Sequence, residues 1–484
     1  MSTQIRPTSP EDNPNVSIPR LHAALGGRVI SPEDAGYDEA RTVFAGGIDR
    51  QPAAIVRVAD ATDVSRVVDL ARETGLELAV RSGGHSIHAT TDGGIVLDLS
   101  DMKKFEIDVE RRTAWAEAGL TAGEYTAAAA AHGLATGFGD TGSVGIGGIT
   151  LGGGVGYLVR KHGLTIDDLL AAEIVTADGE LLYVDAGMNP DLFWAIRGGG
   201  GNFGVATRFK FRLHEVDTVV GGMLMLPATP EVISSFVAEA EAAPEELSTI
   251  ANVMMAPPMP FVPEEMHGRP VIMAMLVYAG EIESGERAVA PFRTLTEPIV
   301  DMVKPMRYPE IYPPDDDDYH PVSSARTMFV EHVDLAAAER IVEYLERSTA
   351  QMAVAQIRVL GGAMARVPAN ATAFAHRSSR IMVNVAAVYG HPNEAPKHEP
   401  WVAAFAAALR QGDRGAYVNF LGDEGEARIR AAYPGTTWDR LTEIKGRYDP
   451  TNLFRLNQNV PPATGGRATG QQETDHGREE AEAS

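Results

Sequence analysis

Residues with chemical potential gather in three glycine-rich segments. The first is RSGGHS, Arg81–Ser86, which directly follows the strand-like run LELAVR. Glycines in such a loop let backbone N–H groups approach an anion closely, as phosphate-binding loops require. The pattern predicts an anion-binding loop that also presents the imidazole of His85. Taken alone, the segment also fits an ordinary turn with a solvated histidine.

The second segment is GDTGSVGIGGITLGGGVG, residues 139–156. Its glycine content is too high for the interior of a helix or strand, yet apolar residues recur among the glycines, namely Val144, Ile146, Ile149 and Leu151. A buried segment without side-chain bulk suits a flat, large ligand that lies against the backbone, because a Cβ would hold that ligand away. A flexible linker is the alternative, but linkers lack the interleaved apolar residues.

The third segment is GGGGNFG, Gly198–Gly204, which matches the GxGxxG pattern of dinucleotide-binding folds. That fingerprint follows a strand and opens a helix, whereas this segment follows the helix-like PDLFWAIR and precedes a strand. We therefore reject a dinucleotide fold. The acidic run Asp315–Asp318 is flanked by prolines and is interpreted as a solvated loop, so no metal site is predicted.

Composition excludes several classes of protein. The chain has 42 Lys and Arg against 66 Asp and Glu, a net charge of -24, which disfavours nucleic acid and anionic membranes as partners. With no cysteine, disulfides, thiolate metal sites and cysteine nucleophiles are impossible. The polar start lacks the apolar stretch typical of a signal peptide, and no run reaches the ~18 apolar residues of a membrane span. We expect a cytoplasmic protein; its oligomeric state is not indicated.

The elements that position these segments follow from periodicity. AIVRV from Ala54 predicts a strand, and Val64, Val67, Val68 and Ala71 follow the spacing of a helix ended by Gly75. Further strands are predicted at GIVLDL, TAWAEAG and VATRFKFRLHEV, with a hairpin turning at Asp178-Gly179. Thr121 and Glu124 form a capping box that opens another helix. From about residue 217 the sequence becomes rich in Met and Pro, and we expect a second domain there.

The order of these motifs resembles the berberine-bridge-enzyme-like branch of the FAD-linked oxidases, the vanillyl-alcohol-oxidase/PCMH superfamily. The similarity covers about residues 47–216 and 415–461, and is carried by RSGGHS, VGIGGITLGGGVGYLVRKHGL, DLFWAIRGGGGNFGV, YVNF and KGRYDPTNLFRLNQNVPP. It implies an α+β fold, with a two-lobed PCMH-type FAD-binding domain and an inserted substrate domain built on an antiparallel sheet covered by helices. The boundaries expected are a disordered N-terminus (1–16), the FAD domain (17–216), the substrate domain (217–411), a returning C-terminal segment (412–462) and a disordered acidic tail (463–484).

The resemblance implies bound FAD, with the backbone of Arg81–Ser86 cradling pyrophosphate and flavin. It also implies a covalent bond from His85 to the flavin 8-methyl carbon, for which a neutral imidazole is a suitable nucleophile. The implied FAD contacts are Arg81, Ser82, Gly83, Gly84, His85, Ser86, Thr141, Val144, Gly147, Gly148, Gly153, Gly154, Val175, Asn457 and Asn459.

The chain departs from the family pattern at three positions. Thr141 stands where many relatives carry a second flavin-linking cysteine, so bicovalent attachment is impossible. Ile149 replaces a frequent histidine, and Asp168 stands where an asparagine often follows the aspartate. Val144 falls where the family places a small residue at the oxygen-accessible face of the flavin, which favours an oxidase.

Catalytic candidates implied by the resemblance are Tyr417 and Asn419 in YVNF. Tyr417 would act as a base only if its phenol pKa, ~10 when unperturbed, were lowered; a buried structural tyrosine is the alternative. His376, Arg377, Asn384 and Tyr389 are further candidates to face the substrate, with sheet structure as the alternative.

The function expected is hydride transfer from a C–H next to an alcohol or amine of a small molecule to flavin N5, followed by reoxidation with dioxygen to give H2O2. A flavin dehydrogenase, an oxidative cyclase of secondary metabolism and a flavin-fold resistance protein that sequesters a small molecule remain open. The Met and Pro residues of 253–263 favour a hydrophobic substrate over a sugar.

Overall fold

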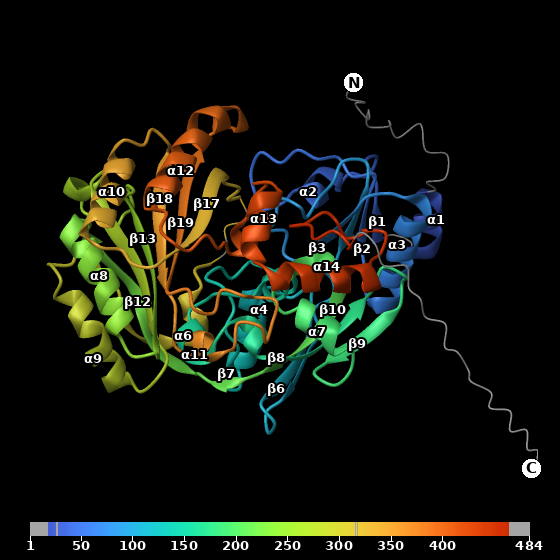
Figure 1. Cartoon of the computed structure of the whole chain (residues 1–484), viewed down its shortest axis with the longest axis horizontal. Coiled ribbons are helices and arrows are strands. Elements are labelled where there is room, and N and C mark those ends of the chain that lie inside the picture. The colour runs from blue at the N-terminus through green and yellow to red at the C-terminus, as the bar shows by residue number, and fades with distance from the viewer. Residues whose placement is uncertain (1–17, 26–27, 315, 317, 464–484) are drawn as a thin grey trace, which may run out of the picture.

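The computed structural model describes residues 18–25, 28–314, 316 and 318–463 of the chain. It has two halves that lie side by side (Figure 1). One half carries the N-terminal strands, and the other is a large sheet with helices on its outer face. The predictions for 1–16 and for the tail from 464 onward fall outside the described residues, as do Asp315 and Asp317 of the acidic run.

The first half begins with a four-stranded sheet of order β1-β2-β4-β3, in which β2, β4 and β3 run parallel. Between β2 and β3 lies the helix expected from the spacing of its apolar residues, capped by Asp60 and ended by Gly75 in the left-handed conformation. The bounds are α1 (Ile18–Leu25), β1 (Val29–Ile30), α2 (Tyr37–Arg41), β2 (Ala54–Arg57), α3 (Ala61–Thr74), β3 (Leu78–Arg81) and β4 (Ile95–Asp98).

A five-stranded antiparallel sheet of order β5-β6-β10-β8-β9 completes the first half. The capping box predicted at Thr121 and Glu124 is present at the start of α4, and Gly179 makes the expected turn between β8 and β9. The bounds are β5 (Phe105–Asp108), β6 (Thr113–Glu117), α4 (Ala122–Ala130), β7 (Leu134–Ala135), α5 (Ile146–Gly152), α6 (Val159–His162), β8 (Leu169–Val175), β9 (Leu181–Asp185), α7 (Pro190–Ala195), β10 (Val205–Arg212) and β11 (His214–Glu215).

The prediction that residues 139–156 contain too much glycine for a helix was wrong, because Ile146–Gly152 forms α5. Ile146, Thr150 and Leu151 of this helix are buried in the core, and that packing outweighs the cost of about 1 kcal/mol that each glycine imposes on a helix. Close neighbours also demand glycine: a Cβ on Gly152 would lie 1.8 Å from Oδ1 of Asn419. The glycines therefore serve close approach, as the sequence indicated, but within a helix.

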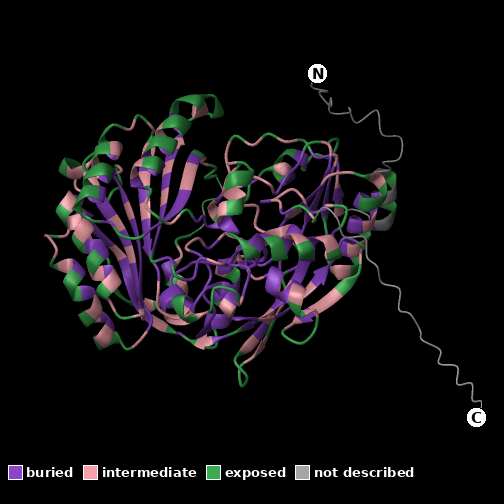
Figure 2. Ribbon diagram, viewed as in Figure 1, coloured by how far each residue is buried: buried purple, intermediate pink, exposed green. Residues whose placement is uncertain are grey.

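The second half is an eight-stranded antiparallel sheet of order β15-β12-β14-β13-β18-β19-β17, with β16 paired to β12. Four helices pack on one face, and in Figure 2 their outer sides are exposed while the strands behind them are largely buried. The strands are β12 (Thr218–Pro227), β13 (Leu247–Met255), β14 (Pro270–Tyr278), β15 (Val300–Asp301), β16 (Lys304–Arg307), β17 (Val322–Val330), β18 (Met352–Val359) and β19 (Ile381–Tyr389). The helices are α8 (Pro230–Ala242), α9 (Ile282–Arg293), α10 (Leu335–Glu346) and α12 (Ala395–Leu409), with the short α11 (Ala363–Arg366) elsewhere.

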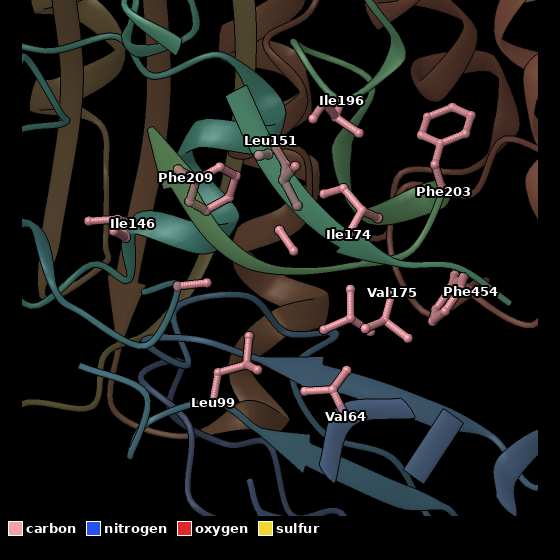
Figure 3. Close-up of a cluster of buried hydrophobic side chains, with 14 of the residues drawn as sticks. Val64, Leu99, Ile146, Leu151, Ile174, Val175, Ile196, Phe203, Phe209 and Phe454 are labelled. Atoms are coloured by element: carbon pink, nitrogen blue, oxygen red, sulfur yellow. The ribbon is translucent and has the colours of Figure 1, made fainter. Parts of the chain in front are cut away.

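After α12 the chain returns to the first half through α13 (Glu426–Ala432) and α14 (Thr436–Tyr448), and α14 lies beside α7 in Figure 1. Lys445 of α14 is fully buried and donates to the carbonyl oxygens of Asn202 and Phe454 and to the carboxylate of Asp449. Figure 3 shows the shared core, where Phe454 of the returning segment lies near Val175 and Phe203. The strands of the large sheet all fall within residues 218–389. The domain boundaries expected at residues 217 and 411 stay predictions.

Candidate functional site

The RSGGHS loop touches the start of α5 backbone to backbone. A Cβ on Gly83 would lie 2.2 Å from the backbone nitrogen of Gly145, and a Cβ on Gly145 would lie 2.1 Å from that of Gly83. Ser82 locks the contact, since its hydroxyl donates to the carbonyl oxygen of Ala118 (2.6 Å) and accepts from the N–H of Gly147 (3.4 Å). The first two glycine-rich segments therefore form one surface.

Arg81 joins the RSGGHS loop to the neighbouring strand β4. Its guanidinium is buried and pairs with the carboxylate of Asp98 (2.7 Å), its register partner on β4. The ion pair lies at the carboxyl ends of two parallel strands and holds the loop above them. The Arg81 side chain is therefore structural, and only its backbone belongs to the predicted cradle.

The imidazole of His85 is clamped between two side chains that the sequence did not indicate. Phe44 stacks on it with ring centroids 4.2 Å apart and planes 13° from parallel. Nε2, at the edge of the ring, lies 3.1 Å from the hydroxyl of Ser143, the residue before Val144. The N–H of Phe44 also donates to the carbonyl oxygen of Gly84 (3.0 Å). These contacts orient the ring.

One glycine of α5 faces open space, and the two glycines that follow the helix are closely packed. Gly148 is exposed, and a Cβ there would meet no atom within 4 Å. Further along, Gly153 and Gly154 have φ angles of 134° and 81°, which favour glycine, and a Cβ on Gly153 would lie 3.2 Å from the ring of Phe374. Val175, another predicted contact, is fully buried, and its side chain packs within the hydrophobic core.

Tyr417 and Asn419 brace the end of α5. The Tyr417 hydroxyl accepts from the N–H of Gly154 (2.9 Å) and from Nδ2 of Asn419 (2.9 Å), which also donates to the carbonyl oxygen of Ile149 (3.1 Å). Burial raises the pKa of Tyr417, although these hydrogen bonds act in the opposite direction. The condition for a base, a lowered pKa, is therefore not met, and the catalytic roles of both residues stay predictions.

The returning segment adds two asparagines. Nδ2 of Asn457 donates to the carbonyl oxygens of Gly201 (3.2 Å) and Phe454 (3.1 Å). Oδ1 of Asn457 and Oδ1 of Asn459 are buried without a hydrogen-bond partner. Buried oxygens in that state are costly unless a ligand donor reaches them. Together with a cradle that side chains would fill, they fit a large ligand rich in hydrogen-bond donors, and FAD is such a ligand.

Four further residues were candidates to face the substrate, and three of them make contacts within the fold. Arg377 forms a two-pronged ion pair with Asp167 (2.7 and 2.8 Å), and the hydroxyl of Tyr389 pairs with that of Ser324. His376 is buried against the carbonyl oxygen of Ala432, and burial lowers its pKa. These three stabilise the fold. Asn384 alone lies on the sheet face opposite the helices, where its Oδ1 is buried and unpartnered.

Asp168, one of the three departures from the family pattern, pairs with a histidine side chain. Asp168 is buried, and its Oδ1 lies 2.8 Å from Nε2 of His214, whose ring stacks on His162. Burial raises the pKa of Asp168, and His214 opposes that shift. The described residues hold no cluster of three or more metal-ligating side chains, and none of their helices is long and apolar enough to cross a bilayer.

Sequence reasoning missed Phe44, Ser143, Asp140 and Arg358. Arg358 of β18 is buried, donates to the carbonyl oxygen of Val155 (3.2 Å) and pairs with Asp140 (2.6 Å). It thereby joins the large sheet to the end of the glycine-rich segment. A lone arginine in a strand carries no signal of such a contact, because the register and the packing of two distant segments create it.

The chain is similar to known proteins in sequence and in fold. The FAD binding domain family matches residues 52–185, and the berberine and berberine-like family matches residues 416–461. An uncharacterised FAD-linked oxidoreductase of Bacillus subtilis is 32% identical over 91% of this chain and 99% of its own length. The (R)-6-hydroxynicotine oxidase of Paenarthrobacter nicotinovorans is 30% identical over 91% of this chain and 97% of its own. A solved xylooligosaccharide oxidase from Myceliophthora thermophila, in complex with xylobiose, superimposes with a TM-score of 0.80 at 25% identity, covering 93% of this chain and 100% of that one.

Proposed function

We propose a reaction for this chain from the premise that it belongs to the berberine-bridge-enzyme-like FAD-linked oxidoreductases. It is an FAD-linked oxidoreductase, and the proposed reaction is that of an oxidase. A C–H bond next to an alcohol or amine of a small organic substrate loses its hydride, and dioxygen is reduced to H2O2. When bound, the flavin supplies a two-electron acceptor for this reaction.

The observation that carries the proposal is the clamped imidazole of His85 in the RSGGHS loop. Phe44 and Ser143 hold the ring at the edge of a cradle made from the backbones of Gly83, Gly145 and their neighbours. A ring with a preset orientation forms a bond faster than a mobile one. We therefore propose that the flavin is covalently attached to His85, and that Asn457 and Asn459 accept hydrogen bonds from the cofactor.

The other site residues then have positioning roles. Tyr417 and Asn419 hold Gly154 and the carbonyl of Ile149, so they fix the backbone against which a substrate would be pressed. Val144 is half-buried and packs against the core next to Gly145, and its small side chain supports the proposal of dioxygen as the oxidant.

Acid precipitation tests the covalent bond. Yellow colour should stay with the precipitated protein in the wild type and should leave the precipitate in His85→Ala. His88→Ala, three residues along, is the matched control and should retain the colour. Release of flavin from the wild type would remove the covalent bond and leave the flavoenzyme, whereas a protein that neither contains nor takes up FAD would refute the proposed function.

Reoxidation tests the choice of oxidant. The substrate-reduced enzyme, mixed with air-saturated buffer in a stopped-flow instrument, should regain its flavin absorbance within one turnover and release one H2O2 for each flavin. Reoxidation far slower than turnover with an artificial electron acceptor would make the protein a dehydrogenase.

A further inference from the structure

A row of polar side chains crosses the face of the large sheet that lies opposite its helices. Side chains alternate between the two faces of a strand, and on this face Arg358 contacts Val155 and Asp140 of the first half. The face is therefore turned toward the glycine-rich segment (Figure 1). Strand register aligns six of its residues, which we call the carboxamide row, in the order Met225, Met273, Asn252, Gln356, Asn384 and Thr327.

The carboxamide row is closed at its ends and accessible in its middle. The two end residues are buried, whereas the four between them are half-buried. On one side of the row Arg358 lies between Ile250 and Met382. On the other side the neighbouring row is entirely apolar and consists of Val271, Met254, Val354, Ala386 and Ala325.

Arg358 fixes the orientation of two carboxamides in succession. A guanidinium only donates, so the amide oxygen of Gln356 must face it, and Nε and Nη2 of Arg358 lie 3.1 and 2.7 Å from that oxygen. The amide nitrogen of Gln356 therefore points the other way and donates to Oδ1 of Asn252 (3.0 Å). Either carboxamide turned over would place donor against donor, so the arrangement has one polarity.

Asn252 is consequently presented to a ligand through its N–H groups. Its oxygen is engaged by Gln356, and Nδ2, on the other arm of the planar amide, makes no hydrogen bond to the described part of the chain. The residue is half-buried, and Nδ2 remains open to solvent. Its other cross-strand partner is Met273, and Met254 follows it on the same face of β13. A donor with such apolar neighbours is satisfied by a ligand that brings an acceptor.

The charges around the carboxamide row favour an uncharged acceptor. The guanidinium of Arg358 is balanced by the carboxylate of Asp140 (2.6 Å). At the Thr327 end, three strands away from Asn252, Arg326 and Arg428 are both held by the carboxylate of Glu424.

A ligand carboxylate beside Asn252 would therefore lose its water against methionine and valine side chains without gaining a free cation. The net charge of -24 also repels anions from the protein as a whole. A carbonyl or ether oxygen on an apolar molecule meets these conditions.

We infer, on the basis of the proposed oxidase function, that Asn252 selects the substrate by donating a hydrogen bond from Nδ2 to a carbonyl or ether oxygen. Arg358 and Gln356 are positioning residues, because they decide which arm of the Asn252 amide faces the ligand. The substrate is an otherwise apolar molecule that carries this oxygen in addition to the alcohol or amine that is oxidised. A sugar is disfavoured, since it would set several hydroxyls against the apolar row.

Three bicyclic ligands of nearly equal size test this selection. 1-Indanone offers a carbonyl acceptor, indole offers an N–H donor, and indane offers neither. None of them has a C–H next to an alcohol or amine, so calorimetry on the flavin-loaded enzyme measures binding without turnover. 1-Indanone should bind about fivefold more tightly than indane, which corresponds to one hydrogen bond of ~1 kcal/mol, and indole should bind less tightly than 1-indanone.

Gln356→Glu should reverse the preference. Both oxygens of the new carboxylate accept, so Arg358 still binds one of them while Nδ2 of Asn252 turns to donate to the other. Asn252 then presents its oxygen, and indole should bind about fivefold more tightly than 1-indanone. Gln351→Glu is the matched control, because it makes the same change in charge at an exposed position just before β18, and it should keep the wild-type order.

Asn252→Leu removes the donor at nearly constant size. In this variant 1-indanone should lose its advantage and bind within about twofold of indane. The flavin content and the midpoint of thermal unfolding of each variant show whether it is folded and loaded before its ligands are compared.

The outcomes separate the two proposals. A protein that neither contains nor takes up FAD refutes the proposed function itself. With flavin bound, a wild type that binds 1-indanone no more tightly than indane, or binds none of the three ligands, overturns the assignment of Asn252 and leaves the oxidase. An Asn252→Leu variant that still prefers 1-indanone overturns it as well. A loaded Gln356→Glu variant with the wild-type order overturns the positioning by Arg358, and if that variant does not fold, the ligand order of the wild type and of Asn252→Leu decides.

Discussion

Replacing Gly83 by alanine tests the backbone contact on which the cradle depends. The new Cβ would lie 2.2 Å from the nitrogen of Gly145, while ordinary contact starts at 3.4 Å, so the loop and α5 must separate by about 1.2 Å. Overpacking of this kind costs about 1–3 kcal/mol. At roughly 2–4 °C per kcal/mol, the midpoint of thermal unfolding should fall by several degrees.

Gly148→Ala is the matched control, since its Cβ meets no atom of the chain within 4 Å. Both substitutions are made in the His85→Ala background, where flavin can be removed and restored, and thermal unfolding is recorded with and without FAD. Gly83→Ala should lower the midpoint even without FAD. Gly148→Ala should leave the flavin-free midpoint unchanged and reduce the stabilisation by FAD, because its Cβ enters the cradle. An unchanged midpoint for Gly83→Ala, with full flavin uptake, would refute the reasoning.

Three other predictions concern buried polar groups. Burial lowers the pKa of His162 to about 3. Below pH ~6.5 the unfolded chain therefore binds a proton at this residue that the folded chain does not. Acidification from pH 7 to pH 5 should lower the free energy of unfolding by about 2 kcal/mol through this group. His162→Gln should remove that part of the loss in thermal unfolding at the two pH values. Lys445→Met leaves Asp449 buried without its cation and should cost ~3–5 kcal/mol in denaturant unfolding. An unchanged free energy of unfolding would contradict this prediction. Tyr417→Phe deprives the buried N–H of Gly154 of its acceptor, at a cost of ~1–3 kcal/mol, but should keep the shape of the pH–rate profile between pH 6 and 9; a lost limb would make Tyr417 the base after all.

Local patterns were sufficient for much of the first half. The spacing of Val64, Val67 and Val68, the cap at Thr121 and the turn at Gly179 each predict an element that the structure contains. These features depend on neighbours within four residues, so the chain carries them wherever it is placed. The same reasoning failed at α5, because the packing of Ile146 and Leu151 against distant strands decides that segment against its glycine content.

By itself, the sequence determined the glycine-rich loops, their order and the family that this order indicates, because close approach of backbones can be achieved only with glycine. Only the tertiary structure decided how the imidazole of His85 is held and how Arg358 of the large sheet meets the glycine-rich segment. Phe44, Ser143 and Arg358 reach the site from elements far apart in the chain, through stacking and strand register. The same burial raises the pKa of Tyr417, which no local pattern can reveal, because desolvation depends on what the rest of the chain packs around the phenol.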